Sequence, residues 1–229
     1  MTLLGLLDGR PLSRAPLDHR LAALRTGPRA SALPAPGSPE DRQLTRWVAQ
    51  VLLTEELCAA EAAARGLDLD AVSTAHLDQR AAVELGSITA AAYEGSAAVR
   101  AVFEAVTAQV TVSPDEVTSY LAATTATTTE RWHITTPDGE FEATPDTLPT
   151  ALAALLRTTP TAIAGWTATR LPDHPTPDPT PDPTPHLLAC ARRLAFTRWL
   201  EHARATRLTL VPGLEHPGDP AQPDNHHRH

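Results

Sequence analysis

Apolar residues recur at helical spacing through most of the first half of the chain. The clearest case begins at Ser38-Pro39-Glu40-Asp41. Serine is a typical N-cap, proline suits the first helical position, and acidic residues favour the positive end of the helix dipole. Apolar positions then share one broad face until Gly66, a residue type that often ends helices. This pattern predicts a helix of about 27 residues, the longest element of the chain.

Similar signals predict the other elements of this half and of the last stretch. Leu3–Leu12 is expected to form an extended hairpin, because Asp8-Gly9 is a favoured two-residue turn. Thr206–Val211 is expected to be extended. Further helices are predicted at residues 13–27, 70–85, 87–93, 96–110, 113–121 and 186–204.

After Ala123 the pattern changes to short alternating runs. These runs predict a small β-β-α-β lobe. Its strands are expected at Arg131–Thr136, Glu140–Ala143 and Ala162–Leu171, and its helix at Asp146–Leu156. Residues 172–185 repeat Thr-Pro-Asp-Pro, which predicts an extended polyproline linker without a core of its own.

Composition restricts the classes of function. The chain has 229 residues and a net charge of −8, which disfavours a general nucleic-acid-binding role. All 19 basic residues are arginine, so lysine-based covalent catalysis is excluded. Cys58 and Cys190 are expected to be buried thiols, with a disulfide between them as the alternative. We expect a cytoplasmic protein, because the N-terminus lacks a signal-peptide pattern and no apolar run could span a bilayer.

Four segments resemble one known family. The extended Leu7–Ser13 leads into a helix, Arg46–Leu57 lies in the long helix, Val110–Tyr120 opens with a Ser-Pro-Asp-Glu start, and Phe196–Leu200 ends in Arg-Trp-Leu. In order and pattern, these segments resemble the SurA N-terminal and PpiC family, whose members include parvulin-type peptidyl-prolyl isomerases. The resemblance implies a helical bundle that is completed by the C-terminal helix, with an isomerase lobe inserted.

The isomerase residues of that family match only in part. Arg131-Trp132-His133-Ile134 is similar to the family's first strand, so His133 corresponds to its first histidine. Thr167 stands where the family has a second histidine. The resemblance therefore implies an incomplete isomerase site. His133 remains a candidate catalytic residue or a half-exposed strand histidine, and Trp132 and Trp166 either line a substrate cleft or belong to the core.

The last fifteen residues, Glu215–His229, contain four of the ten histidines. Imidazole and carboxylate ligands suit zinc, iron, nickel or copper. Turn-forming Pro-Gly-Asp-Pro chemistry favours an ordered segment, whereas the spacing matches no established metal motif. The segment is therefore either a specific metal site or a solvated tail that binds metal opportunistically. The candidate ligands are His216, Asp219, His226, His227 and His229.

Together these observations predict an α+β protein that is mainly α. A SurA-like helical bundle is expected from residues 1–123 and 186–211, a reduced parvulin-like β-β-α-β lobe from 129–171, a linker at 172–185 and a His-rich tail at 212–229. The expected function is chaperone-like binding of a polypeptide client or partner enzyme. A small-molecule enzyme of specialised metabolism with a metal or acid–base site in the tail is one alternative, and residual prolyl isomerisation through His133 is another.

Overall fold

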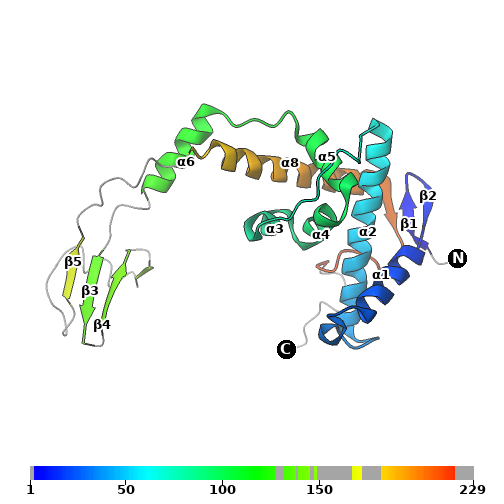
Figure 1. The fold of residues 1–229 in the computed structure, drawn as a ribbon, viewed down its shortest axis with the longest axis horizontal. Coiled ribbons are helices and arrows are strands. Elements are labelled where there is room, and N and C mark those ends of the chain that lie inside the picture. Colours follow the sequence, from blue (N-terminus) through cyan, green and yellow to red (C-terminus); the bar gives the residue numbers. More distant parts are fainter. Residues whose placement is uncertain are drawn as a thin grey trace. The chain divides into compact units, whose positions relative to one another are not determined.

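The computed structural model describes residues 3–126, 132–137, 139–144, 147–148, 167–171 and 182–219. Helices predominate in it, beside two three-stranded antiparallel sheets, which confirms the predicted α+β class (Figure 1). The chain separates into two compact units. The first combines residues 1–111 with 188–229, and the second comprises residues 112–187.

A small sheet joins segments from near the two ends of the chain. Strand β1 (Leu3–Leu7) pairs with β2 (Arg10–Ser13) on one side and with β6 (Leu208–Leu210) on the other, antiparallel in both cases. The turn residues Asp8 and Gly9 both have positive φ, 51° and 77°. This is the conformation that a tight two-residue hairpin requires, and it confirms the predicted turn.

Helix α2 (Pro39–Arg65) is the centre of the first unit, as the sequence predicts. The Ser38 hydroxyl accepts a hydrogen bond from the Asp41 amide at 3.1 Å, and Gly66 ends the helix at φ 64°. One side of α2 packs on α1 (Ala15–Thr26). Another side packs on α4 (Ser87–Gly95) and α5 (Ala97–Thr107).

Helix α8 (Thr184–Arg207) supplies the aromatic part of the same core. The Phe196 ring lies edge-on to Phe103, with centroids 5.2 Å apart, and stacks on Trp199. Aromatic pairs of this geometry add to the stability gained from burial alone. The C-terminal helix therefore completes the core of the first unit, although about 80 residues separate it from α5 along the sequence.

Helix α3 (Gln79–Leu85) is much shorter than predicted. The predicted helix begins at Asp70, but the chain turns helical only after Asp78, whose carboxylate accepts from the Ala81 amide at 2.7 Å. Just before it, the Leu77 amide donates to Glu94 on α4 at 2.8 Å. These bonds fix a helix start at Asp78, because a capping aspartate has extended backbone geometry.

The second unit contains α6 (Pro114–Ala126) and a sheet of order β4-β3-β5. Its strands are β3 (Trp132–Thr136), β4 (Gly139–Ala143) and β5 (Thr167–Arg170), which agree with the predicted positions. The contacts group α6 with this unit, whereas the sequence assigned it to the bundle. Most of the predicted helix 146–156 lies outside the described residues. None of the described helices is long and apolar enough to cross a membrane.

Candidate functional site

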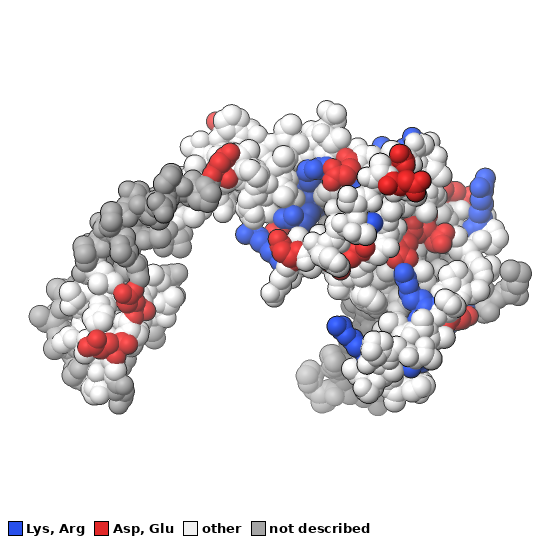
Figure 2. Space-filling model, in the orientation of Figure 1, with Lys and Arg blue, Asp and Glu red and all other residues white. Residues whose placement is uncertain are grey.

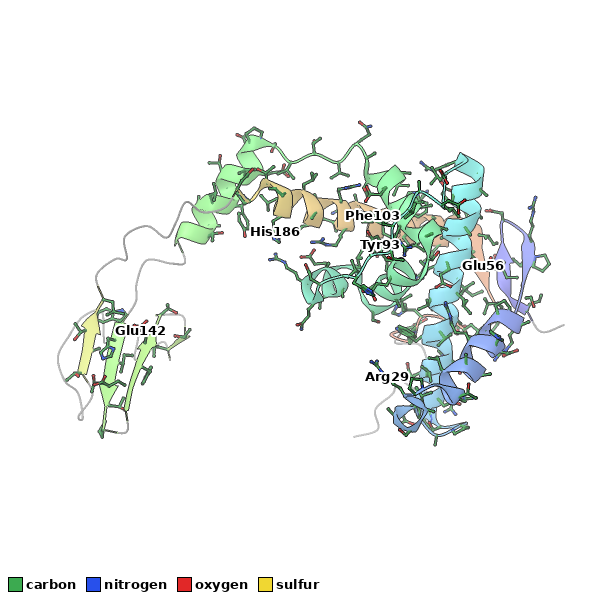
Figure 3. The ribbon with its side chains drawn as sticks, viewed as in Figure 1. Arg29, Glu56, Tyr93, Phe103, Glu142 and His186 are labelled. Atoms are coloured by element: carbon green, nitrogen blue, oxygen red, sulfur yellow. The ribbon has the colours of Figure 1, made fainter. Side chains whose placement is uncertain are left out.

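A small cavity opens between α3, α4, α5 and α8, all within the first unit. Its volume is about 140 Å³. Most of its wall is apolar, and the Tyr93 and Phe103 rings meet edge-on with centroids 5.4 Å apart (Figure 3). The lining residues are Leu77, Leu85, Tyr93, Phe103, Ala189, Arg192 and Arg193. A cavity of this size matches a benzene ring, whereas sites for drug-sized ligands occupy several hundred Å³.

The arginines of the cavity already have acidic partners. Arg193 pairs with Glu84 at 2.6 Å, and Arg192 pairs with Glu104 while its guanidinium lies 5.3 Å from the centre of the Phe103 ring. Figure 2 shows the same mixing of arginines and acidic side chains over the visible face of this unit. The cavity therefore offers an apolar interior with a balanced charged rim.

Tyr93 supplies the polar group of the cavity. In the described part of the chain, its hydroxyl makes no hydrogen bond, and burial raises its pKa, with the Glu104 charge adding to the effect. A neutral phenol can donate one hydrogen bond to a ligand oxygen. The sequence analysis did not identify this cavity, because its residues come from four helices and carry no recognisable motif.

His133 and Trp132 lie on opposite faces of the second sheet, as the alternation predicts. Trp132 is 5% exposed and packs with Ile134 and Ala168 in the core of the lobe, so its ring is not open to a substrate. His133 is partly exposed, and its Nε2 lies 3.5 Å from a Glu140 carboxylate oxygen. Trp166 lies outside the described residues.

The register of the sheet shows what shares the His133 face. His133 is paired with Thr169, and Thr135 with Thr167, so all four side chains point the same way. Thr167 is thus a neighbour of His133 at the position where the family resemblance implies a second histidine. Threonine does not titrate near neutral pH, so this face lacks a histidine pair among the residues described.

The first residues of the His-rich tail are folded against α2. Leu214 is 5% exposed in the core formed with α1 and α2, and its carbonyl accepts a hydrogen bond from Gln50 at 2.7 Å. The Asp219 amide donates to the His216 carbonyl at 2.9 Å, which closes a turn. Up to Asp219, the tail is therefore an ordered part of the first unit.

His216 has a defined protonation pattern in this turn. Its Nδ1 accepts a hydrogen bond from the Gly218 amide at 3.0 Å, so the neutral ring carries its proton on Nε2. Burial, and next the charge of Arg204, lower the pKa of His216. Neither nitrogen offers a free lone pair in this conformation, so a metal ion would have to displace the Gly218 bond.

Of the five predicted metal ligands, the structure places two. His216 and Asp219 share the turn, and the described residues contain no group of three or more side chains suited to a metal ion. His226, His227 and His229 lie outside the described residues. Both cysteines are free: Cys58 is buried and Cys190 is half-buried, so the disulfide alternative is not formed.

A polar stripe on α2 faces the end of α8 and the tail. Arg46, Gln50 and Thr54 recur every four residues on α2, and all three are buried. Arg204 of α8 donates to the Thr54 hydroxyl and to the Gln50 carbonyl, the latter at 3.2 Å. Sequence analysis missed this stripe, because the partners of these residues lie about 150 residues away.

Comparison with known proteins leaves the family open. The model of a family of unknown function (DUF7158) matches residues 3–40, which contain β1, β2 and α1. No curated protein and no solved structure matches the chain.

Proposed function

We propose that the chain is a polypeptide-binding protein on the SurA and parvulin plan, chaperone-like or partner-binding, without a complete isomerase site. The cavity between α3, α4, α5 and α8 carries this proposal. At about 140 Å³ it is too small for most small-molecule substrates and fits a single apolar side chain. A side chain of this kind is what an unfolded client or an extended partner segment offers.

The polar groups of the cavity suit the same occupant. The unbonded Tyr93 hydroxyl can donate to a backbone carbonyl beside the inserted side chain. The Arg192 and Arg193 charges are balanced by Glu104 and Glu84, so the rim does not demand an acidic or a basic ligand. Selection by apolar volume and one hydrogen bond supports binding of many sequences.

The test fills the cavity without removing any core residue. Ala189 lines the cavity, so Ala189→Leu should occupy part of its volume. Leu194 lies five positions later on α8, about 140° around the helix, and is exposed. Leu194→Phe therefore adds similar bulk outside the cavity and is the matched control.

Binding is measured by fluorescence anisotropy with a reduced, carboxymethylated and permanently unfolded polypeptide. Burying one apolar side chain contributes about 1.5–3 kcal/mol. Ala189→Leu should therefore weaken binding by about tenfold or more, at unchanged Tm, while Leu194→Phe binds like the wild type. Equal affinity of Ala189→Leu and wild type would contradict the proposal, as would a wild type that does not bind.

A second candidate is a metal-dependent enzyme that acts on a small molecule through the tail. The ordered turn that ends at Asp219 favours it, because the remaining tail ligands start from a fixed point. Truncation after Asp219 removes His226, His227 and His229 and retains Leu214 in the core. This candidate expects stoichiometric zinc, iron, nickel or copper by mass spectrometry of the tag-free chain, and its loss on truncation. Sub-stoichiometric metal in the full chain contradicts it.

A further inference from the structure

Arg204 is a buried cation held only by neutral acceptors. Its Nη2 donates to the Thr54 hydroxyl and the Gln50 carbonyl, whereas its Nε is buried without a hydrogen-bond partner in the described part of the chain. No described carboxylate lies within ion-pair distance of it. Burial lowers the pKa of Arg204, as expected for a charge moved away from water.

Neighbouring arginines on α8 differ in this respect. Arg192 pairs with Glu104, Arg193 with Glu84, and Arg207 with both Asp8 and Glu61. The nearby carboxylates are thus already engaged by Arg207. A buried charge without a partner of opposite sign is costly, so the positive charge of Arg204 is left to be balanced by something other than these groups.

The geometry leaves one amino group of Arg204 for a ligand. Nη2 is used by α2 and Nε is sealed from solvent, but Nη1 makes no hydrogen bond among the described residues and is not sealed. His216 lies near enough to feel the Arg204 charge, and its neutral ring presents Nε2–H as a second donor. One positive charge and two donors match a singly charged anion with two oxygens.

We propose that Arg204, with the turn at His216, forms a binding site for a carboxylate group at the junction of α2, the end of α8 and the tail. The carboxylate can belong to a small organic acid or to the C-terminus of a peptide, since the two present the same group. This site is separate from the cavity at Tyr93 and does not depend on the function proposed for it.

The test compares carboxylate with chloride at constant ionic strength and pH. The probes are sodium acetate, a short peptide with a free C-terminus, and the same peptide as its C-terminal amide. Wild-type Tm should rise with acetate or with the acid peptide and stay constant with the amide. A larger rise with the peptide assigns the site to C-termini, and an equal rise assigns it to small acids; either result supports the site.

Arg204→Met is the informative variant, and Arg198→Met is its control, because Arg198 is an exposed arginine on the same helix. Arg204→Met leaves the Gln50 carbonyl bonded to the Thr54 hydroxyl, so no new buried acceptor is orphaned. It should raise Tm in chloride and abolish the carboxylate-dependent rise, which Arg198→Met retains. No rise in the wild type, or the same rise in Arg204→Met, overturns the proposal.

A second measurement does not depend on the variants. The Nε–H signal of Arg204 in the wild type should shift during titration with acetate, and that of Arg198 should not. Its Nε is sealed from solvent, which slows exchange and keeps the signal observable. Titration without any shift of the Arg204 signal also overturns the proposal.

Discussion

Arg207 and Asp8 form a two-bonded ion pair that links the end of α8 to the turn of the first hairpin. The Arg207 Nη2 lies 2.7 Å from one Asp8 oxygen, and its Nε lies 3.0 Å from the other. The Asp8 amide also donates to the Arg207 carbonyl at 2.9 Å. Because 199 positions separate the two residues, this pair holds together segments that local interactions cannot join.

Asp8→Asn should cause a small loss of stability that depends on pH. The Arg207 hydrogen bond holds the pKa of Asp8 below its ordinary value of 3.8. A lowered folded-state pKa stabilises the protein above 3.8, and the gain disappears as pH falls through the folded-state pKa. Asparagine tolerates the positive φ of this position, so the change isolates the charge.

The measurement is Tm by circular dichroism from pH 2 to 8. The difference between wild type and Asp8→Asn should be constant above about pH 5 and shrink in acid. Asp70→Asn, at an exposed aspartate without an ion pair in the described part of the chain, is the control. A difference that grows in acid would count against the pair.

Gly5→Ala should destabilise the small sheet. A Cβ at this position would lie 2.7 Å from the Thr209 carbonyl oxygen, and backbone on a paired strand cannot move aside without breaking the pairing. We expect a loss of about 1–3 kcal/mol in urea unfolding, as for other overpacked sites. Unchanged stability would mean that β6 does not approach β1 in solution.

The two thiols should differ in reactivity. Burial raises the pKa of Cys58 to about 12, so the thiolate fraction at pH 8 is about one in ten thousand. Cys190 is half-buried on α8. With a chromogenic disulfide reagent, one thiol per chain should react in the native state and the second only after unfolding. Rapid reaction of both would contradict the packing of α2.

Prolyl isomerisation should be absent, because Thr167 replaces the second histidine beside His133. A proline-peptide assay should give the uncatalysed rate with the wild type and with His133→Ala. A catalysed rate that His133→Ala abolishes would restore the isomerase hypothesis. Thr167→His is the complementary variant, since it adds the missing ring on the same face of the sheet.

Local signals in the sequence predicted the elements whose determinants are local. The Asp8-Gly9 turn and the Ser38 cap each act within four residues, and both are formed as expected. The predicted helix from Asp70 failed where two signals competed: apolar spacing continued upstream, but the Asp78 cap and the Leu77–Glu94 bond set a later start. Capping geometry outweighs weak periodicity here.

The contacts that define the candidate sites could not be predicted in the same way. The Arg204 bonds to α2 and the pairing of β6 with β1 join residues 150 or more positions apart. Three-residue β6 is too short to carry a specific pattern. The cavity at Tyr93 likewise depends on where four helices end in space, which no single segment encodes.

The discontinuity of the first unit has a consequence for synthesis on the ribosome. Its N-terminal part, up to residue 111, is made before α8 and β6 exist, and residues 112–187 must come first. At about 5–20 residues per second, the interval lasts several seconds. During that time β1 lacks its second partner and the core around Phe103 lacks Phe196. The nascent N-terminal part is thus exposed to aggregation and to cellular chaperones until the last helix emerges.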